Sequence, residues 1–210
     1  CYNICMQFII HHGTFGSRDG NWFPWLDAEL TKLGQNVVRP QLPVDDFAEV
    51  ETSLKNSGTY QNPKQTKTSW LSTFKETVLP QLIGEPLVVV AHSSAPAFTL
   101  SSVTEFDLKL DSAIFVSPFI EDLGNKTFDI INNDFYKDEF DFAKIKNNIP
   151  HSYTLYSDTD PYVPMSAGQS FARHLESHEI LVKSAGHMGS AFTEFPVVLE
   201  LCKTRIGFGE

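Results

Sequence analysis

The chain has 210 residues, 41% hydrophobic and 20% charged, which excludes disorder and collagen-like repeats and predicts one globular domain over residues 1–210. Its formal net charge of −10 argues against nucleic acid as a partner, because such binding depends on Lys and Arg displacing counterions. The apolar runs fall far short of the roughly 20 residues of a membrane-spanning helix, so no membrane span is expected.

The first third of the chain predicts two strands and two helices separated by loops. A long polar connection with at most one helical turn, around residues 47–54, is expected between the two helices. Pro80 is expected to end or bend the second helix. The strands are predicted at residues 6–11 and 36–40, the connection at 41–65, and the helices at 22–33 and 68–83.

The run Pro86 to His92 (P-L-V-V-V-A-H) is typical of a central strand buried on both faces, as in parallel sheets covered by helices. Strands and helices then alternate to the end of the chain. The further strands are expected at residues 113–116, 152–156 and 179–182, and the helices at 93–103, 166–175 and 193–203. This alternation predicts an α/β fold, a mostly parallel sheet with helices on both faces and ligand chemistry at the carboxyl ends of its strands.

Residues 119–150 interrupt the alternation with an acidic, aromatic segment. Two interpretations stay open. The segment is either a surface excursion that packs its aromatic rings on the domain, or a small lid over a site.

A serine flanked by small residues follows the central strand in A-H-S-S-A, with Ser93 at its centre and Ala91 and Ala95 two positions away. A nucleophile elbow needs this layout, because a sharp strand-to-helix turn projects the hydroxyl and leaves no room for larger flanking side chains. Ser93 is therefore a candidate nucleophile.

A serine nucleophile needs a base and a carboxylate that orients the base. Asp160 and His187 each follow a predicted strand, in the Ser, Asp, His order of α/β-hydrolases. Asp158 competes with Asp160 for the acid role, and Asp122 is a third candidate.

An oxyanion hole requires two backbone N–H groups aimed at the charge that develops on the substrate carbonyl. Ser94 is expected to supply one. The loop after the first strand should supply the other, from Thr14 or alternatively from Phe15. We expect Phe15, Trp22 and Met188 to contact substrate, with a place in the core as the alternative for Trp22.

The three cysteines, Cys1, Cys5 and Cys202, cannot all pair within one chain, which favours a reducing compartment and hence a cytoplasmic location. No zinc-type spacing of Cys and His, no Gly-rich phosphate loop and no secretory signal is evident. The sequence therefore predicts neither a metal nor a cofactor.

The motifs H-G, W-F-P-W, A-H-S, D-P-Y-V-P and A-G-H together resemble the small serine hydrolases of the YdeN and retinoblastoma-binding protein 9 type, within the α/β-hydrolase superfamily. The resemblance spans nearly the whole chain and implies Ser93 as nucleophile, Asp160 as acid and His187 as base. It implies hydrolysis of carboxylic esters or related acyl substrates. An aminopeptidase-type amide hydrolase and a catalytically weak scaffold that binds a protein partner are the alternatives.

Overall fold

Six parallel strands form one sheet in the order β2-β1-β3-β4-β5-β6. The structure is a computed structural model and describes residues 5–207. The strands are β1 (Gln7–His11), β2 (Asn36–Val38), β3 (Leu87–His92), β4 (Ser112–Val116), β5 (Ser152–Tyr156) and β6 (His178–Leu181). The parallel sheet confirms the predicted α/β fold.

Strand β3 lies inside the sheet, and all six of its residues are buried. Successive side chains of a strand point to opposite faces of the sheet. Val88 and Val90 accordingly pack in one apolar core, and Val89 and Ala91 pack in the other. The continuous apolar run is therefore explained by burial on both sides, as predicted.

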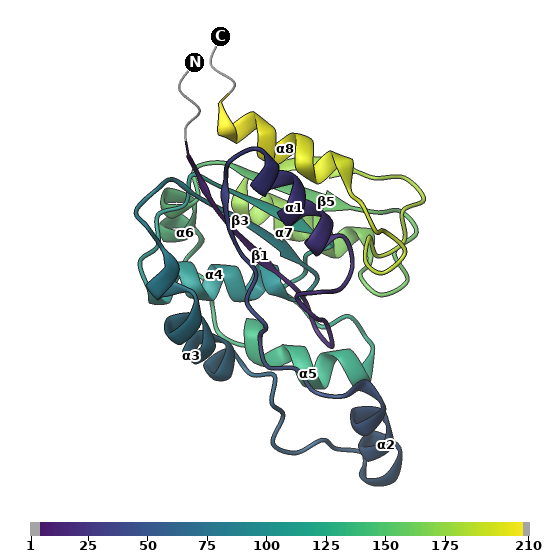
Figure 1. The fold of residues 1–210 in the computed structure, drawn as a ribbon. Coiled ribbons are helices and arrows are strands. Elements are labelled where there is room, and N and C mark those ends of the chain that lie inside the picture. Colours follow the sequence, from purple (N-terminus) through teal and green to yellow (C-terminus); the bar gives the residue numbers. More distant parts are fainter. Residues whose placement is uncertain (1–4, 208–210) are drawn as a thin grey trace.

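Helices cover both faces of the sheet (Figure 1). Side chains of α1 and α8 contribute to one core, and those of α3, α4, α6 and α7 contribute to the other. None of the helices within residues 5–207 is long and apolar enough to cross a membrane. The helices are α1 (Phe23–Lys32), α2 (Phe47–Ser57), α3 (Lys67–Thr77), the 3₁₀ helix η1 (Leu79–Gln81), α4 (Ala95–Glu105), α5 (Lys126–Tyr136), α6 (Phe142–Asn148), α7 (Met165–Leu175) and α8 (Pro196–Ile206).

The connection before α3 holds more structure than the single helical turn expected there. Helix α2 is 11 residues long, and the Asp46 side chain caps it by accepting the N–H of Glu49. Gly58 ends the helix with φ at +74°, a left-handed conformation that glycine adopts without strain. These capping residues were the local signal for the helix. Helix α3 ends at Thr77, just before Pro80.

The segment 119–150 folds into α5 and α6, which pack against different pairs of helices. Helix α6 packs against α4 and α7 and belongs to the crossover between β4 and β5. Helix α5 packs against α4 and α2, and Figure 1 shows α2 and α5 together at one end of the molecule. Phe135 of α5 belongs to the same core as the side chains of α6, so both helices pack on the domain, and a role of α5 as a lid stays a prediction.

Cys5 and Cys202 carry free thiols, and Cys1 lies outside the described residues. Cys202 is buried on α8, and this burial raises the pKa of its thiol. A protonated, inaccessible thiol has no nucleophilic role.

Candidate active site

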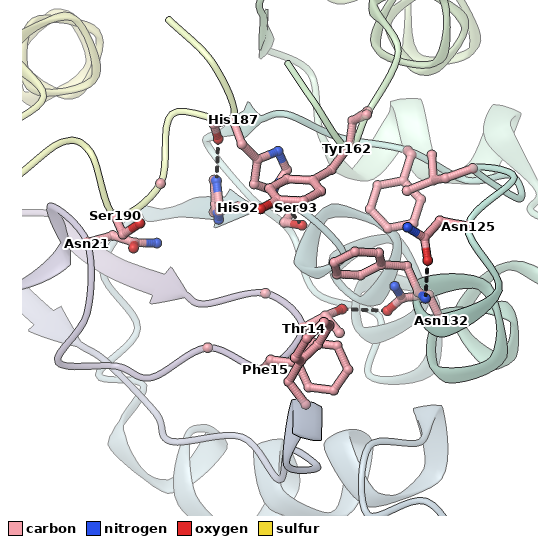
Figure 2. Close-up of a pocket in the computed structure, with 18 residues that line it drawn as sticks. Thr14, Phe15, Asn21, His92, Ser93, Asn125, Asn132, Tyr162, His187 and Ser190 are labelled. Atoms are coloured by element: carbon pink, nitrogen blue, oxygen red, sulfur yellow. Dashed lines mark hydrogen bonds between the residues drawn. The ribbon is translucent and has the colours of Figure 1, made fainter. Parts of the chain in front are cut away.

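A cavity of about 480 Å³ opens at the carboxyl ends of the strands, a volume within the range of small-molecule sites. It lies beside β1 and β3, the neighbouring strands at which the strand order reverses, where open α/β sheets bind ligands. Figure 2 shows Thr14 and Phe15 from the loop after β1, and Asn132 from α5, on one part of its rim, with Ser93 and His187 on another. It is lined by Gly13, Thr14, Phe15, Gly16, Asn21, Phe47, His92, Ser93, Phe119, Leu123, Asn125, Phe128, Asn132, Tyr162, Val163, His187, Gly189 and Ser190.

Ser93 occupies the sharp turn between β3 and α4. Its φ is +65°, a left-handed conformation that is strained for a residue with a side chain. The turn is held by the Ser93 N–H, which donates to the carbonyl of Val116 at 2.8 Å. Ala91 and Ala95 are both fully buried, which explains why larger residues would not fit there. This is the geometry of a nucleophile elbow.

His187 bridges Ser93 and Asp160. Its Nε2 lies 3.1 Å from Ser93 Oγ, and its Nδ1 lies 2.7 Å from Asp160 Oδ2. The Asp160 side chain is 2% exposed and that of His187 is 18% exposed, and the imidazole lines the cavity whereas the carboxylate lies behind it. Three side chains far apart in the sequence therefore form one hydrogen-bonded row.

The Asp160 carboxylate is held ionised by its neighbours. Burial by itself would raise its pKa, but the hydrogen bonds from His187 and from the N–H groups of Val163 and Tyr162 outweigh burial and hold the pKa below its ordinary value. The two backbone donors reach Oδ1 at 3.0 and 2.9 Å, which leaves Oδ2 for the imidazole. A carboxylate placed so fixes the proton of the imidazole on Nδ1 and leaves Nε2 free to accept one.

The two competing carboxylates have other partners. Asp158 accepts the N–H of Ser184 at 2.7 Å, and Asp122 accepts the hydroxyl of Tyr136 at 3.1 Å. Asp158 therefore anchors the loop that leads to His187, and the structure brings only Asp160, of the three acids considered, to the imidazole.

Two hydroxyl side chains beside Asp158 anchor the same loop. Ser157 and Thr159 accept the two backbone N–H groups that follow Ser184, each at 3.1 Å. Together these three side chains hold the backbone immediately before His187. The sequence analysis missed this role, although the run S-D-T-D carries three short acceptors in a row.

Gly13 brings the loop after β1 against Ser93. A Cβ at Gly13 would lie 2.6 Å from Ser93 Cβ and 2.8 Å from the carbonyl oxygen of His92, so only glycine fits. The next N–H, that of Thr14, and the N–H of Ser94 donate to no backbone carbonyl among the described residues. Ser94 also occupies the N-cap position of α4, whose N-terminal end favours negative charge. Both N–H groups are thus suited to an oxyanion.

A polar network beneath this loop joins four segments of the chain. Thr14 Oγ1 lies 2.8 Å from Ser94 Oγ and 2.5 Å from Asn132 Oδ1 (Figure 2). Gln65 Nε2 donates to Thr14 Oγ1 at 3.1 Å and to Asn132 Oδ1 at 2.9 Å. Asn132 and Gln65 were not singled out in the sequence, because nothing near them in the chain marks them.

Two further histidines near the cavity are neutral. Burial, together with the nearby His187, lowers the pKa of His92 to about 3, and its Nε2–H donates to the carbonyl of His187 at 2.9 Å. Burial also lowers the pKa of His12, whose Nε2 accepts the N–H of Leu42 at 3.0 Å. Both rings are structural. No group of three or more His, Cys, Asp or Glu within residues 5–207 is arranged to hold a metal ion.

Trp22 lies in the core, which was the alternative considered for it, and Met188 also lies there, so the prediction that these two residues contact substrate is corrected. The Trp22 side chain is 0% exposed and Met188 is 1% exposed, and neither lines the cavity. A buried indole needs an acceptor, and Trp22 Nε1–H finds the carbonyl of Met188 at 2.8 Å. Trp22 thus supports the loop that carries His187. Phe15, the third residue of that prediction, does line the cavity.

Comparison with protein families agrees with this geometry. The model of the family described as serine hydrolase matches residues 8–204, nearly the entire described chain. The chain belongs to the serine hydrolase family. The resemblance to YdeN-type hydrolases predicted from the motifs is thereby confirmed. No curated protein sequence matches this serine hydrolase.

Solved structures share the fold of this serine hydrolase over almost its full length. The ydeN gene product of B. subtilis has a TM-score of 0.77 at 24% identity, covering 95% of this chain and 97% of that one. Est1E from Butyrivibrio proteoclasticus, with ferulic acid bound, has a TM-score of 0.68 at 16% identity, covering 97% and 88%. A structure of the metagenome-derived lipolytic enzymes LipS and LipT has 0.67 at 13%, covering 96% and 93%.

Proposed function

We propose that this serine hydrolase cleaves carboxylic esters or related acyl substrates, with Ser93 as nucleophile, His187 as base and Asp160 as the orienting acid. The observation that carries the proposal is the position of His187, within hydrogen-bonding distance of both Ser93 and Asp160. Proximity of this kind activates a hydroxyl that is otherwise a weak nucleophile.

The reaction has two halves. His187 Nε2 accepts the proton of Ser93 as Ser93 Oγ attacks the substrate carbonyl, and the imidazolium is stabilised by the Asp160 carboxylate. His187 then gives the proton to the leaving alkoxide, which leaves the acyl group bonded to Ser93. Water, deprotonated by His187, attacks that acyl group, and Ser93 recovers its proton as the acid departs.

The oxyanion of each tetrahedral intermediate is assigned to the N–H groups of Thr14 and Ser94. The close approach of Gly13 to Ser93 supports this assignment, because it sets the Thr14 N–H next to the nucleophile. Loss of one such donor typically costs about 10²- to 10³-fold in kcat. The hydrogen bonds of Asn132 and Gln65 restrain the Thr14 side chain and so support the same loop.

The test compares the wild type with Ser93→Ala in hydrolysis of short-chain aryl esters and in labelling by a fluorophosphonate probe. We expect kcat to fall by a factor on the order of 10⁶ and labelling to disappear, by analogy with the loss of a complete triad. Ser101→Ala, a serine of α4 that bonds only the carbonyl of Ala97, is the matched control and should behave as wild type. Unchanged turnover in Ser93→Ala would refute the proposal.

Aminoacyl arylamides belong in the same substrate panel, because esters and amides pass through the same tetrahedral intermediate. Faster cleavage of the amides would assign the protein to amide hydrolysis. A folded wild-type protein that hydrolyses neither class and takes up no probe would favour the protein-binding alternative.

A further inference from the structure

Four aromatic side chains, which we call the aromatic wall, line the cavity: Phe15, Phe47, Phe128 and Tyr162. Phe15 lies 5.3 Å from Phe47 and 5.9 Å from Phe128, and Phe128 lies 5.3 Å from Tyr162, measured between ring centroids. They come from the loop after β1, from α2, from α5 and from the loop after β5. Only the tertiary fold brings them together.

The wall begins at the proposed catalytic residues. The ring of Tyr162 meets that of His187 edge to face, at 5.2 Å and 86° between the planes, and the Tyr162 N–H donates to Asp160. Figure 2 shows Tyr162 beside Ser93 and His187, with Phe15 on the opposite side of the cavity. A substrate whose carbonyl sits at Ser93 therefore has the wall within reach of the groups attached to it.

The conformation of the wall favours contact with a ligand. Phe15 has φ at +55°, and strained backbone of this kind gathers at ligand sites. Phe47 is 42% exposed and Tyr162 is 49% exposed, so the described part of the chain leaves much of both residues uncovered. Aromatic rings attract further rings in edge-to-face or offset packing.

The cavity also selects against charge. No Asp, Glu, Lys or Arg is among the described residues that line it, and burial keeps His92 neutral. A charged substituent would lose its hydration there without gaining an ionic partner. A neutral aromatic ring would lose little hydration free energy on entering the cavity.

We propose that the substrates carry a neutral aromatic group, in the acyl half or the alcohol half, that packs against the aromatic wall. This inference rests on the proposed ester hydrolysis and adds the class of substrate. An aromatic ring in either half of the ester would make the same contact with the wall. Matched substrates show which half carries the ring.

The test uses two pairs of esters that differ only in a phenyl or a cyclohexyl ring. Methyl 3-phenylpropanoate and methyl 3-cyclohexylpropanoate vary the acyl half, and benzyl acetate and cyclohexylmethyl acetate vary the alcohol half. In at least one pair we expect kcat/KM to be about 2- to 12-fold higher for the phenyl ester, the factor that an aromatic pair contributes beyond burial of its area. A cyclohexyl ester as good or better in both pairs would overturn the inference.

Phe128→Leu removes the ring at the centre of the wall while keeping an apolar side chain. It should bring the phenyl and cyclohexyl esters to equal kcat/KM. Phe142→Leu is the control, since Phe142 lies on α6, stacks on His174 and does not line the cavity. It should keep the preference. A phenyl preference that survives in Phe128→Leu would also overturn the inference.

A binding measurement separates failure of the inference from failure of the proposed function. Ser93→Ala is titrated with 3-phenylpropanamide and with 3-cyclohexylpropanamide by calorimetry. Tighter binding of the phenyl amide supports the aromatic wall even if the wild type hydrolyses none of the esters, an outcome that would refute only the proposed reaction. Equal affinities, or tighter binding of the cyclohexyl amide, would refute the inference even if esters are hydrolysed.

Discussion

Gly13→Ala would put a methyl group into the contact between the loop after β1 and Ser93. The added Cβ would lie 2.6 Å from Ser93 Cβ, 2.8 Å from the His92 carbonyl oxygen and 3.3 Å from Ser93 Oγ. The two nearest atoms, Ser93 Cβ and the His92 carbonyl oxygen, belong to the turn itself. Neither is the end of a flexible side chain, so neither can move aside without moving the backbone. The φ of Gly13 is not in the left-handed region, so backbone conformation does not require glycine there. The lack of space for a Cβ is what requires it.

The size of the effect follows from the overlap. Ordinary van der Waals contact begins at 3.4 Å, so the loop and the elbow must separate by roughly 1 Å. A misplacement of about 1 Å in a catalytic group costs about 10²-fold in rate. Because the Thr14 N–H follows Gly13 directly, we expect kcat to fall by about 10²- to 10³-fold. Overpacking should also lower the free energy of unfolding by about 1–3 kcal/mol.

The assay measures kcat and KM on phenyl acetate and the free energy of unfolding in urea, each beside Gly20→Ala. A Cβ at Gly20 meets only the carbonyl oxygen of Ser17, at 3.4 Å, so that control should match wild type in both measurements. If Gly13→Ala keeps the kcat and the stability of the control, the loop does not place an oxyanion donor against Ser93 and the reasoning fails.

Two other predictions concern ionisable groups. Asp160→Asn should lower kcat for ester hydrolysis by about 10⁴-fold, because the imidazole loses the carboxylate that orients it. Asp158→Asn should lower kcat far less, because Asp158 anchors the N–H of Ser184 and does not contact the imidazole. Equal decreases in kcat would contradict the assignment of the acid. Burial lowers the pKa of His11 to about 3, and neither of its ring nitrogens has a hydrogen-bond partner among the described residues. In the unfolded chain, His11 is protonated as the pH falls below about 6.5, whereas in the folded protein it stays neutral. The free energy of unfolding of the wild type therefore falls as the pH falls. Urea unfolding should show His11→Leu losing about 2 kcal/mol less than wild type between about pH 7 and pH 5, and equal losses would contradict the burial of a neutral ring.

The order of the elements followed from local patterns. Three consecutive valines in β3 predicted a strand buried on both faces, because a strand alternates its side chains and each face meets a layer of helices. The serine after that strand, and the Asp and His after later strands, were candidates for the same reason: carboxyl ends of parallel strands share one edge of the sheet. The structure brings these three side chains together, and their catalytic roles stay predictions.

The lining of the cavity did not follow from local patterns. Helix α2 was expected as a single turn, and α5 was assigned to a segment whose role stayed open. Met188 was expected at the cavity wall and lies in the core, and Trp22 takes its alternative place there. The indole N–H of Trp22 meets the backbone of Met188 across 166 positions of sequence. Spacing along the chain carries no information on such a pairing.

The sequence by itself determined the succession of strands and helices, the elbow serine and the residues able to act as its base and acid, because periodicity, small flanking residues and chain order are local properties. Tertiary structure alone decided which aspartate reaches His187, how Thr14 is tied to Asn132 across 118 positions, and which aromatic rings face the cavity. Those outcomes depend on how helices and loops distant in sequence pack on the sheet, and packing is a property of the whole chain.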